Sequence, residues 1–289
     1  MRYEGTIIRP PSEAFSIILQ VTVGCSYNRC TFCGAYKDKQ FRIKTEEEIE
    51  EDLLFAARYC RRQNRVFLAD GDVLILPQKR LSALLAKIRA HLPWARRVSL
   101  YGNARSIRAK SVAELTALKS YGLDRVYMGL ESGSDEILER VAKGETVEGM
   151  VEAAQRINDS GLFLSVTTLL GLAGVELSET HARQSAEALN RMTPKQVAAL
   201  TLMPMANTLI GRQHQAGLFH LPDQYGILRE LRILVAGLEL SRSLFHANHA
   251  SNYLPIEGTL QKDKEKILAT IDLALAGGTK LVPDAMRAL

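Results

Sequence analysis

The stretch that decides the fold is Ser16-Ile-Ile-Leu-Gln-Val-Thr-Val23, which runs directly into Gly24-Cys25-Ser-Tyr-Asn-Arg-Cys30-Thr-Phe-Cys33-Gly34. The first part is short, almost entirely apolar and rich in β-branched residues, which is typical of a strand buried on both faces. Three of the four cysteines then fall within nine residues. A disulfide framework would spread its cysteines and pair them, so this cluster predicts metal binding or redox chemistry at the carboxyl end of the first strand.

Further strands and helices alternate along the chain. Five more apolar runs are predicted strands: Arg65–Ala69, Arg97–Tyr101, Arg125–Leu130, Phe163–Leu170 and Gln196–Met203. Helices are predicted between and after them, over 45–60, 79–91, 115–121, 147–159, 178–192, 224–240 and 263–276. Thr45 with Glu48, and Ser111 with Glu114, have the spacing of capping boxes. Parallel strands need long crossovers, so the pattern predicts an α/β fold, either a partial barrel or an open doubly wound sheet. In both, ligands gather at the carboxyl ends of the strands.

Composition narrows the class of protein. The 289 residues are 46% apolar and carry a net charge of +5, with basic residues spread among acidic ones. That pattern favours a solvated surface, and no dense arginine run or RNA-binding motif indicates a nucleic-acid partner. There is no apolar run long enough for a membrane span, and the N-terminus lacks the pattern of a signal peptide. We therefore expect a cytoplasmic protein without membrane contact.

The three clustered thiols, Cys25, Cys30 and Cys33, favour an iron–sulfur cluster with an open coordination site. A 4Fe–4S cluster normally takes four thiolates, and three leave one iron free for an outside ligand. A zinc site remains an alternative, although the loop contains no histidine and the chain no second cysteine pair. Cys60 ends the first predicted helix, away from the loop, and is interpreted as a small core residue.

The cysteine loop resembles that of the radical S-adenosylmethionine (SAM) superfamily, whose usual spacing has three residues between the first two cysteines. This chain has four. The run Gly129-Leu-Glu-Ser-Gly133 is similar to that of the branch of oxygen-independent coproporphyrinogen oxidase and the methylthiotransferases. The resemblance implies a partial (β/α)6 TIM-like barrel over residues 1–210, with a C-terminal helical extension, residues 211–289, packed on it as one domain. It also implies two cofactors, a 4Fe–4S cluster and SAM, in an oxygen-sensitive enzyme that works anaerobically.

The resemblance also implies which residues hold SAM. Phe32 stands where the family contacts adenine, unless it only covers the cluster, and Tyr36 is a second candidate. Asp70, Gly71 and Asp72 stand where the family binds the methionyl ammonium, with a plain turn as the alternative. Glu131 and Ser132 match the ribose position. Lys143 stands where relatives carry a basic residue near SAM, with a solvated lysine as the equal alternative.

Strand ends supply the remaining cofactor candidates. Asn103 and Arg105 follow the third strand, where Arg105 would pair with the SAM carboxylate or an anionic substrate, or else lie on the surface. Ser165 and Thr167 precede a glycine-rich turn, Gly171-Leu-Ala-Gly174, that would let backbone approach the nucleoside. Met203 ends the sixth strand as an apolar wall by the adenine or as ordinary core.

The segment from His246 to Pro255 gathers polar side chains after the last long strand–helix unit. His246, His249 and Tyr253 are candidate catalytic residues of a substrate loop, and hydrogen-bonded packing is the alternative. The expected reaction is hydrogen abstraction by a 5′-deoxyadenosyl radical from a small or medium-sized molecule, with flavodoxin or ferredoxin as the reductant. A nucleic-acid-modifying radical SAM enzyme and a non-catalytic iron–sulfur or zinc module remain the alternatives.

Overall fold

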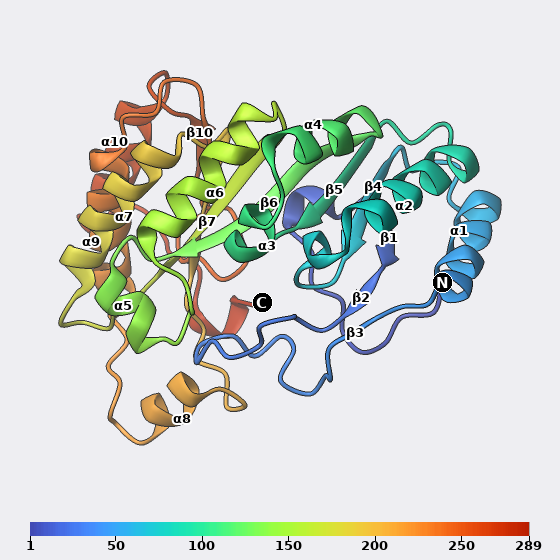
Figure 1. Ribbon diagram of the computed structural model, residues 1–289. Coiled ribbons are helices and arrows are strands. Elements are labelled where there is room, and N and C mark those ends of the chain that lie inside the picture. Colours follow the sequence, from blue (N-terminus) through green and yellow to red (C-terminus); the bar gives the residue numbers. More distant parts are fainter. Residues whose placement is uncertain (289) are drawn as a thin grey trace. The chain divides into compact units, whose positions relative to one another are not determined.

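The computed structural model describes residues 1–288 and has an α/β fold whose main sheet contains eight strands over that range (Figure 1). The chain divides into two compact units, described in turn below. The first comprises Met1–Asn28, Ala35–Met128 and Ala153–Leu164, and the second comprises Arg29–Gly34, Gly129–Glu152 and Ser165–Leu289. The cysteine loop is therefore shared, with Cys25 in the first unit and Cys30 and Cys33 in the second.

Four parallel strands build the first unit. β1 (Ile17–Gln20), β4 (Arg65–Ala69), β5 (Arg97–Tyr101) and β6 (Leu123–Glu131) lie in that order. Val66, Phe67 and Leu68 are completely buried, which is why β4 reads as a continuous apolar run. A small antiparallel sheet pairs β2 (Thr22–Val23), just before the cysteine loop, with β3 (Arg42–Ile43), which begins eight residues after Gly34.

The helices of the first unit begin where the capping signals placed them. α1 (Glu46–Tyr59) and α4 (Val112–Ser120) each start with a complete capping box, from Thr45 and Ser111. The other helical segments here are α2 (Gln78–His91), α3 (Ala104–Arg108), η1 (Pro11–Glu13) and η2 (Val73–Ile75). α1 packs on β1 and α2, and α2 packs on α4. Cys60 ends α1 and is partly exposed, so its interpretation as a core residue was wrong.

The second unit continues the same alternation. β7 (Phe163–Leu170), β8 (Gln196–Thr201) and β9 (Leu244–His246) are parallel, and β10 (Glu257–Thr259) pairs antiparallel to β9. Its helical segments are α5 (Asp135–Arg140), α7 (Ser178–Met192), α8 (Leu209–Gln215), α9 (Gln224–Gly237), α10 (Lys264–Leu275) and η3 (Asp284–Met286). α6 (Val147–Asp159) starts in this unit and ends in the first. α9 packs between α7 and α10.

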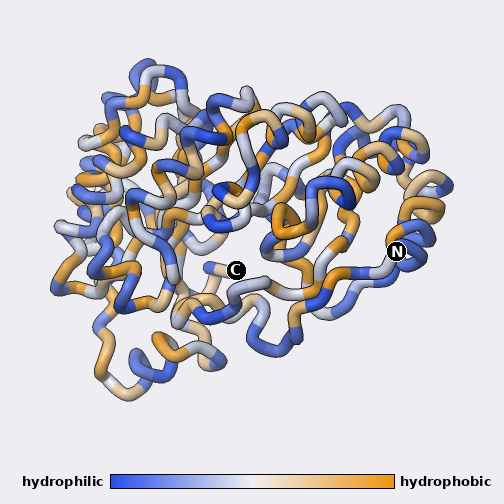
Figure 2. Tube along the Cα trace, in the orientation of Figure 1, coloured by the Kyte–Doolittle hydropathy of each residue, from blue (hydrophilic) through white to orange (hydrophobic). Residues whose placement is uncertain are grey.

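The predicted α/β fold with mostly parallel strands is confirmed. Apolar residues concentrate along the strands, while the helices alternate between polar and apolar positions (Figure 2). The segment after residue 210 contains helices, as expected, and also the two short strands β9 and β10, which the sequence pattern did not predict. The division at residue 210 stays a prediction. Within residues 1–288, no helix has the length and apolar character needed to cross a membrane.

Candidate functional site

Cys25 lies against the turn that follows β4. The amide of Gly71 donates to the carbonyl of Gly24 at 3.2 Å. A Cβ added at Gly71 would lie 2.9 Å from the Cβ of Cys25 and 2.9 Å from Cε2 of Tyr36. Only glycine leaves room for this approach, so Gly71 brings the end of β4 next to the first cysteine. Tyr36 is buried here, beside the ammonium of Lys39.

The two carboxylates that flank Gly71 have different surroundings. Oδ2 of Asp70 accepts from Nε2 of Gln20 at 2.9 Å and from the amide of Gly24 at 3.2 Å, and Nζ of Lys39 lies 3.5 Å away. Oδ1 of Asp70 is buried and has no protein partner. Burial raises the pKa of this carboxyl, and its hydrogen bonds oppose the shift. Asp70 thus retains one acceptor that a ligand donor could satisfy.

Asp72, in contrast, is fully engaged by the protein. Its Oδ2 accepts from the hydroxyls of Ser26 at 2.8 Å and Ser106 at 2.7 Å, and from Nδ2 of Asn103 at 2.9 Å. Its Oδ1 accepts from the amide of Asn103 at 3.2 Å. Asp72 therefore fixes the residue after Cys25 to the loop after β5. Near it, the guanidinium of Arg105 lies 5.8 Å from the ring of Tyr27.

The second part of the cysteine loop is anchored in the second unit. The amide of Thr31 donates to the carbonyl of Val141 at 2.9 Å, and the carbonyl of Thr31 accepts from the amide of Ile210 at 3.1 Å. Phe32 packs against an apolar cluster that includes Val141, Leu169 and Ile210. The carbonyl of Gly34 accepts from Nδ2 of Asn207 at 3.0 Å. These contacts hold Cys30 and Cys33 on a fixed stretch of backbone.

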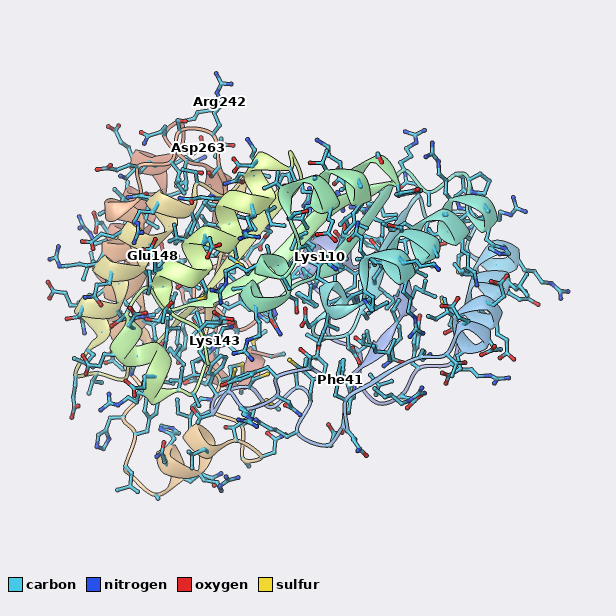
Figure 3. The ribbon with its side chains drawn as sticks, viewed as in Figure 1. Phe41, Lys110, Lys143, Glu148, Arg242 and Asp263 are labelled. Carbon is cyan, nitrogen blue, oxygen red and sulfur yellow. The ribbon has the colours of Figure 1, made fainter. Side chains whose placement is uncertain are left out.

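Glu131 and Lys143 form an ion pair beside these two cysteines. Nζ of Lys143 lies 2.9 Å from Oε1 of Glu131, and their side chains are only 17% and 14% exposed. Burial lowers the pKa of Lys143, but the negative charges of Glu131, Cys30 and Cys33 outweigh it and raise that pKa overall. The site therefore places a cation where thiolates must be stabilised. Figure 3 labels Lys143, which follows α5.

The glycines of Gly129-Leu-Glu-Ser-Gly133 each admit a close neighbour. A Cβ at Gly129 would lie 2.0 Å from Oε1 of Glu131, because the carboxylate folds back over this residue. Glu131 has a φ of +64°, in the left-handed region that non-glycine residues rarely adopt. A Cβ at Gly133 would lie 2.1 Å from the carbonyl oxygen of Gln184. The motif thus aims Glu131 and brings the end of β6 against α7.

Ser132 takes part in a buried hydrogen-bond network. Its Oγ lies 2.8 Å from Nδ1 of His181, whose Nε2 lies 3.2 Å from the carbonyl of Leu169 and 3.5 Å from Oε1 of Glu230. Oε1 of Glu230 accepts from the amide of Gly171 at 2.7 Å, and its Oε2 accepts from the hydroxyl of Ser178. The network joins the carboxyl ends of β6 and β7 to α7 and α9.

Burial sets the protonation of this network. It lowers the pKa of His181 to about 4 and raises the pKa of Glu230 to about 7. Sequence reasoning missed both residues. A signal existed, because Glu230 falls on the apolar face of α9 with Ile227, Leu231 and Leu234.

The remaining strand-end candidates are buried or partly exposed. Ser165 is buried, and its hydroxyl has no protein partner. Thr167 and Met203 are partly exposed. Their roles toward SAM stay predictions.

The segment with His246, His249 and Tyr253 is tied to β8 and to the residues near the C-terminus. Nδ1 of His246 lies 3.3 Å from Nε2 of Gln196, and Nδ1 of His249 lies 2.9 Å from Oγ of Ser251. Asn252 donates to the carbonyl of Ala199 and accepts from the hydroxyl of Thr201, both at 2.8 Å. The hydroxyl of Tyr253 donates to Asp284 at 2.8 Å. This geometry fits packing along β8, and the catalytic role of the three residues stays a prediction.

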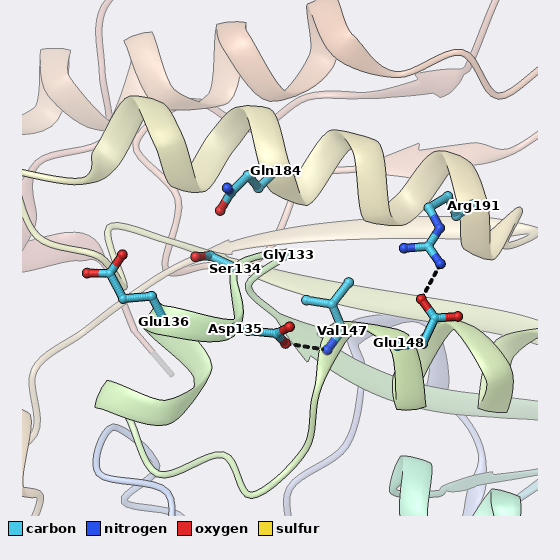
Figure 4. Close-up of a pocket in the computed structure, with 8 residues that line it drawn as sticks. All are labelled: Gly133, Ser134, Asp135, Glu136, Val147, Glu148, Gln184 and Arg191. Atoms are coloured by element: carbon cyan, nitrogen blue, oxygen red, sulfur yellow. Dashed lines mark hydrogen bonds and ion pairs between the residues drawn. The ribbon is translucent and has the colours of Figure 1, made fainter.

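A cavity of about 420 Å³ adjoins the Gly133 end of the motif (Figure 4). It is lined by Gly133, Ser134, Asp135, Glu136, Val147, Glu148, Gln184 and Arg191. Oδ1 of Asp135 accepts from the amide of Val147 at 2.7 Å, and Arg191 pairs with Glu148. The charges that Figure 4 joins by dashed lines therefore already have protein partners.

The donor chemistry of the loop fits an iron–sulfur cluster. None of the four cysteines, all of which lie in the described part of the chain, forms a disulfide. In the described part of the chain, no three His, Cys, Asp or Glu side chains are already grouped around a metal position. The negative charges of Cys30 and Cys33 help to raise the pKa of Lys143, so a cation lies close enough to balance the charge of thiolate ligands. The unpartnered Oδ1 of Asp70 and the close approach of Gly71 to Cys25 fit a ligand at this loop.

Comparison with known proteins identifies the family. The profile described as the radical SAM superfamily matches residues 19–183, more than half of the chain. The chain belongs to the radical SAM superfamily. Enzymes of this superfamily use a 4Fe–4S cluster and SAM, so the predicted class and both predicted cofactors are confirmed.

Individual relatives differ in length and identity. The 4′-phospho-dehydrooxetanocin synthase of Priestia megaterium is 26% identical over 170 residues, which are 52% of this chain and 23% of that protein. The crystal structure of methylornithine synthase (PylB) matches 94% of this chain and 73% of its own, with 16% identity and a TM-score of 0.57. Coproporphyrinogen III oxidase (HemN) from Escherichia coli matches 76% and 52%, with 15% identity and a TM-score of 0.56. The chain spans less than a quarter of the curated relative, and the two structures show the shared fold.

Proposed function

We propose that this radical SAM enzyme cleaves SAM reductively and uses the resulting radical to abstract hydrogen from a small or medium-sized molecule. When bound, the cluster supplies one electron, which splits SAM into methionine and a 5′-deoxyadenosyl radical that takes a hydrogen atom from the substrate. The observation that carries the proposal is the Glu131–Lys143 ion pair beside Cys30 and Cys33.

Different residues of the chain would bind the cluster and the separate parts of SAM. Cys25, Cys30 and Cys33 would hold three irons of the cluster, with Lys143 balancing the thiolate charge. Glu131 has one oxygen on Lys143 and a second oxygen that can accept from ribose hydroxyls. Asp70 has its unpartnered oxygen for the methionyl ammonium, whereas Asp72 has the supporting role of fixing Asn103. Phe32, packed in its apolar cluster, would cover the site and exclude water.

Anaerobic reconstitution tests the cluster. The protein is loaded with iron and sulfide, and its iron content and absorbance are measured. Wild type should be brown, Cys30→Ala should lose the colour, and Cys60→Ala should keep it, since Cys60 lies at the end of α1. A colourless wild type that carries zinc would overturn the proposal.

Turnover and SAM binding complete the test. Reconstituted wild type with SAM and dithionite should release 5′-deoxyadenosine, measured by liquid chromatography against a cluster-free control. Glu131→Gln should weaken SAM binding by about tenfold, roughly 1.4 kcal/mol, because a charged acceptor becomes a neutral one. The exposed Glu139→Gln is the matched control. No 5′-deoxyadenosine above the cluster-free control would reject the proposed function.

A further inference from the structure

A groove of about 220 Å³ in the second unit is built on the cysteine loop. Thr31, which follows Cys30 directly, forms part of its wall. The hydrogen bonds of Thr31 to Val141 and Ile210 tie that wall to α5 and α8. The other lining residues are Arg140, Leu172, Ala173, Gly174, Val175, Glu176, Leu209, Gln213, Leu218, Phe219 and His220. The groove therefore adjoins the residue that follows Cys30.

Three large apolar side chains around this groove are exposed. Val175 is 51% exposed, Leu209 is 43% exposed and Leu218 is 78% exposed. They come from three different segments: the loop after β7, the start of α8 and the loop after α8. Single exposed apolar residues are ordinary, but several around one groove mark a surface that another protein covers.

The charge of the α8 side of this groove is one-sided. Residues 205–222, which form α8 and its flanks, contain no Asp or Glu, while they include Arg212, His214 and His220. Arg140 also lines the groove, and Glu176 is the only carboxylate among the described residues that line it. An apolar groove beside a basic α8 segment is complementary to an acidic partner.

We propose that this groove docks the small acidic electron-transfer protein that reduces the cluster. The proposal rests on the proposed function, because that function needs one electron per SAM cleaved. The donor loses one electron and the cluster gains it, and no other reactant is required. A protein seated here contacts the residue next to Cys30, and none of the proposed SAM-binding residues lines the groove. Electron-transfer encounters are small and transient, which suits a compact groove beside a basic segment.

The test compares two reductants. The rate of 5′-deoxyadenosine formation is measured with dithionite and with increasing reduced flavodoxin, a small acidic flavoprotein. Leu218→Glu and Arg212→Glu should each raise the KM for flavodoxin at least tenfold and leave the dithionite rate unchanged. Leu273→Glu on α10, where the leucine is 54% exposed, is the matched control and should change neither value. Wild type should also show a KM for flavodoxin that rises with salt.

Each contrary result has a distinct meaning. An unchanged KM in both groove variants, or a wild type that responds to dithionite but not to flavodoxin, would overturn the docking proposal. An equal loss with both reductants would do so too, because the groove would then support the site itself. A wild-type dimer that Leu218→Glu converts to a monomer would assign the groove to a second copy. A wild type without product even with dithionite would refute the proposed function, and the docking proposal with it.

Discussion

The buried pair of His181 and Glu230 should make opposite contributions to the pH dependence of stability. The pKa of Glu230 is raised to about 7 from 4.5, so its stabilising contribution is complete below pH 4.5 and is lost as the pH rises through 7. The pKa of His181 is lowered to about 4 from 6.5, so its contribution is complete above pH 6.5 and is lost as the pH falls through 4. In wild type the two slopes largely cancel between these limits.

Single substitutions should reveal the pH dependence that each residue contributes to the free energy of unfolding. Each shift corresponds to about 3 kcal/mol at about 1.4 kcal/mol per pKa unit. The free energy of unfolding of Glu230→Gln, relative to wild type, should therefore increase by about 3 kcal/mol between pH 4.5 and 7. That of His181→Gln, relative to wild type, should decrease by a similar amount between pH 4 and 6.5. Urea unfolding followed by circular dichroism at intervals across this range measures both differences.

The control for this experiment is Glu179→Gln, at an exposed position on α7. Because Glu179 lies on the surface outside the buried pair, this variant should show neither of the two changes described above. These slopes are those of a neutral pair, in which Nε2 of His181 donates to the carbonyl of Leu169 and Nδ1 accepts from the hydroxyl of Ser132. If the pair were instead a charged His181–Glu230 ion pair, Glu230→Gln would lose stability relative to wild type as the pH rises. A flat or falling difference refutes the neutral assignment.

Three further substitutions test other parts of the structure by urea unfolding. Asp72→Asn replaces one carboxylate oxygen with an amide NH2 group, which donates where Asp72 only accepts. It should lower the free energy of unfolding by about 1 to 3 kcal/mol, whereas Asp124→Asn, at an exposed position, should leave it almost unchanged. Gly133→Ala places a methyl group against the backbone of α7 and should lower the free energy of unfolding by about 3 kcal/mol or more. In the control, Gly277→Ala, the methyl group meets no atom within 4 Å, so only the φ of +80° should matter, at about 1 kcal/mol. Asn252→Ala removes two hydrogen bonds to β8 and should lower the free energy of unfolding by about 2 kcal/mol, while the dithionite-driven rate of 5′-deoxyadenosine formation is retained. A large loss of that rate with normal stability would instead favour a substrate role for this segment.

The long strands and helices could be predicted because the burial of their residues determines the pattern of apolar residues in the sequence. β4, β5 and β7 occur where continuous apolar runs indicated them, and α6 and α7 begin and end at the expected residues. The short elements could not be predicted in this way. α3 and α5 have only five and six residues, and neither has a side-chain cap, so their formation depends on tertiary contacts.

The site was predictable only where its chemistry needs a rare residue. Three cysteines in one loop are a strong signal, and the family was identified from them and from the Gly129–Gly133 run. The support around them uses ordinary residues, such as Ser26 and Ser106 on Asp72, whose roles depend on contacts across distant parts of the chain. Sequence pattern placed Asp70 and Asp72 together, but only geometry separates the carboxylate with an unpartnered oxygen from the one that is fully engaged.

The carboxylate of Glu131 occupies the space where a side chain at position 129 would begin. The two positions are therefore sterically coupled. An alanine at 129 would require the Glu131 carboxylate to move, and with it the oxygen that pairs with Lys143. The glycine keeps open the space in which the acid reaches its lysine, so the spacing of this motif contains a steric dependence between two neighbouring residues.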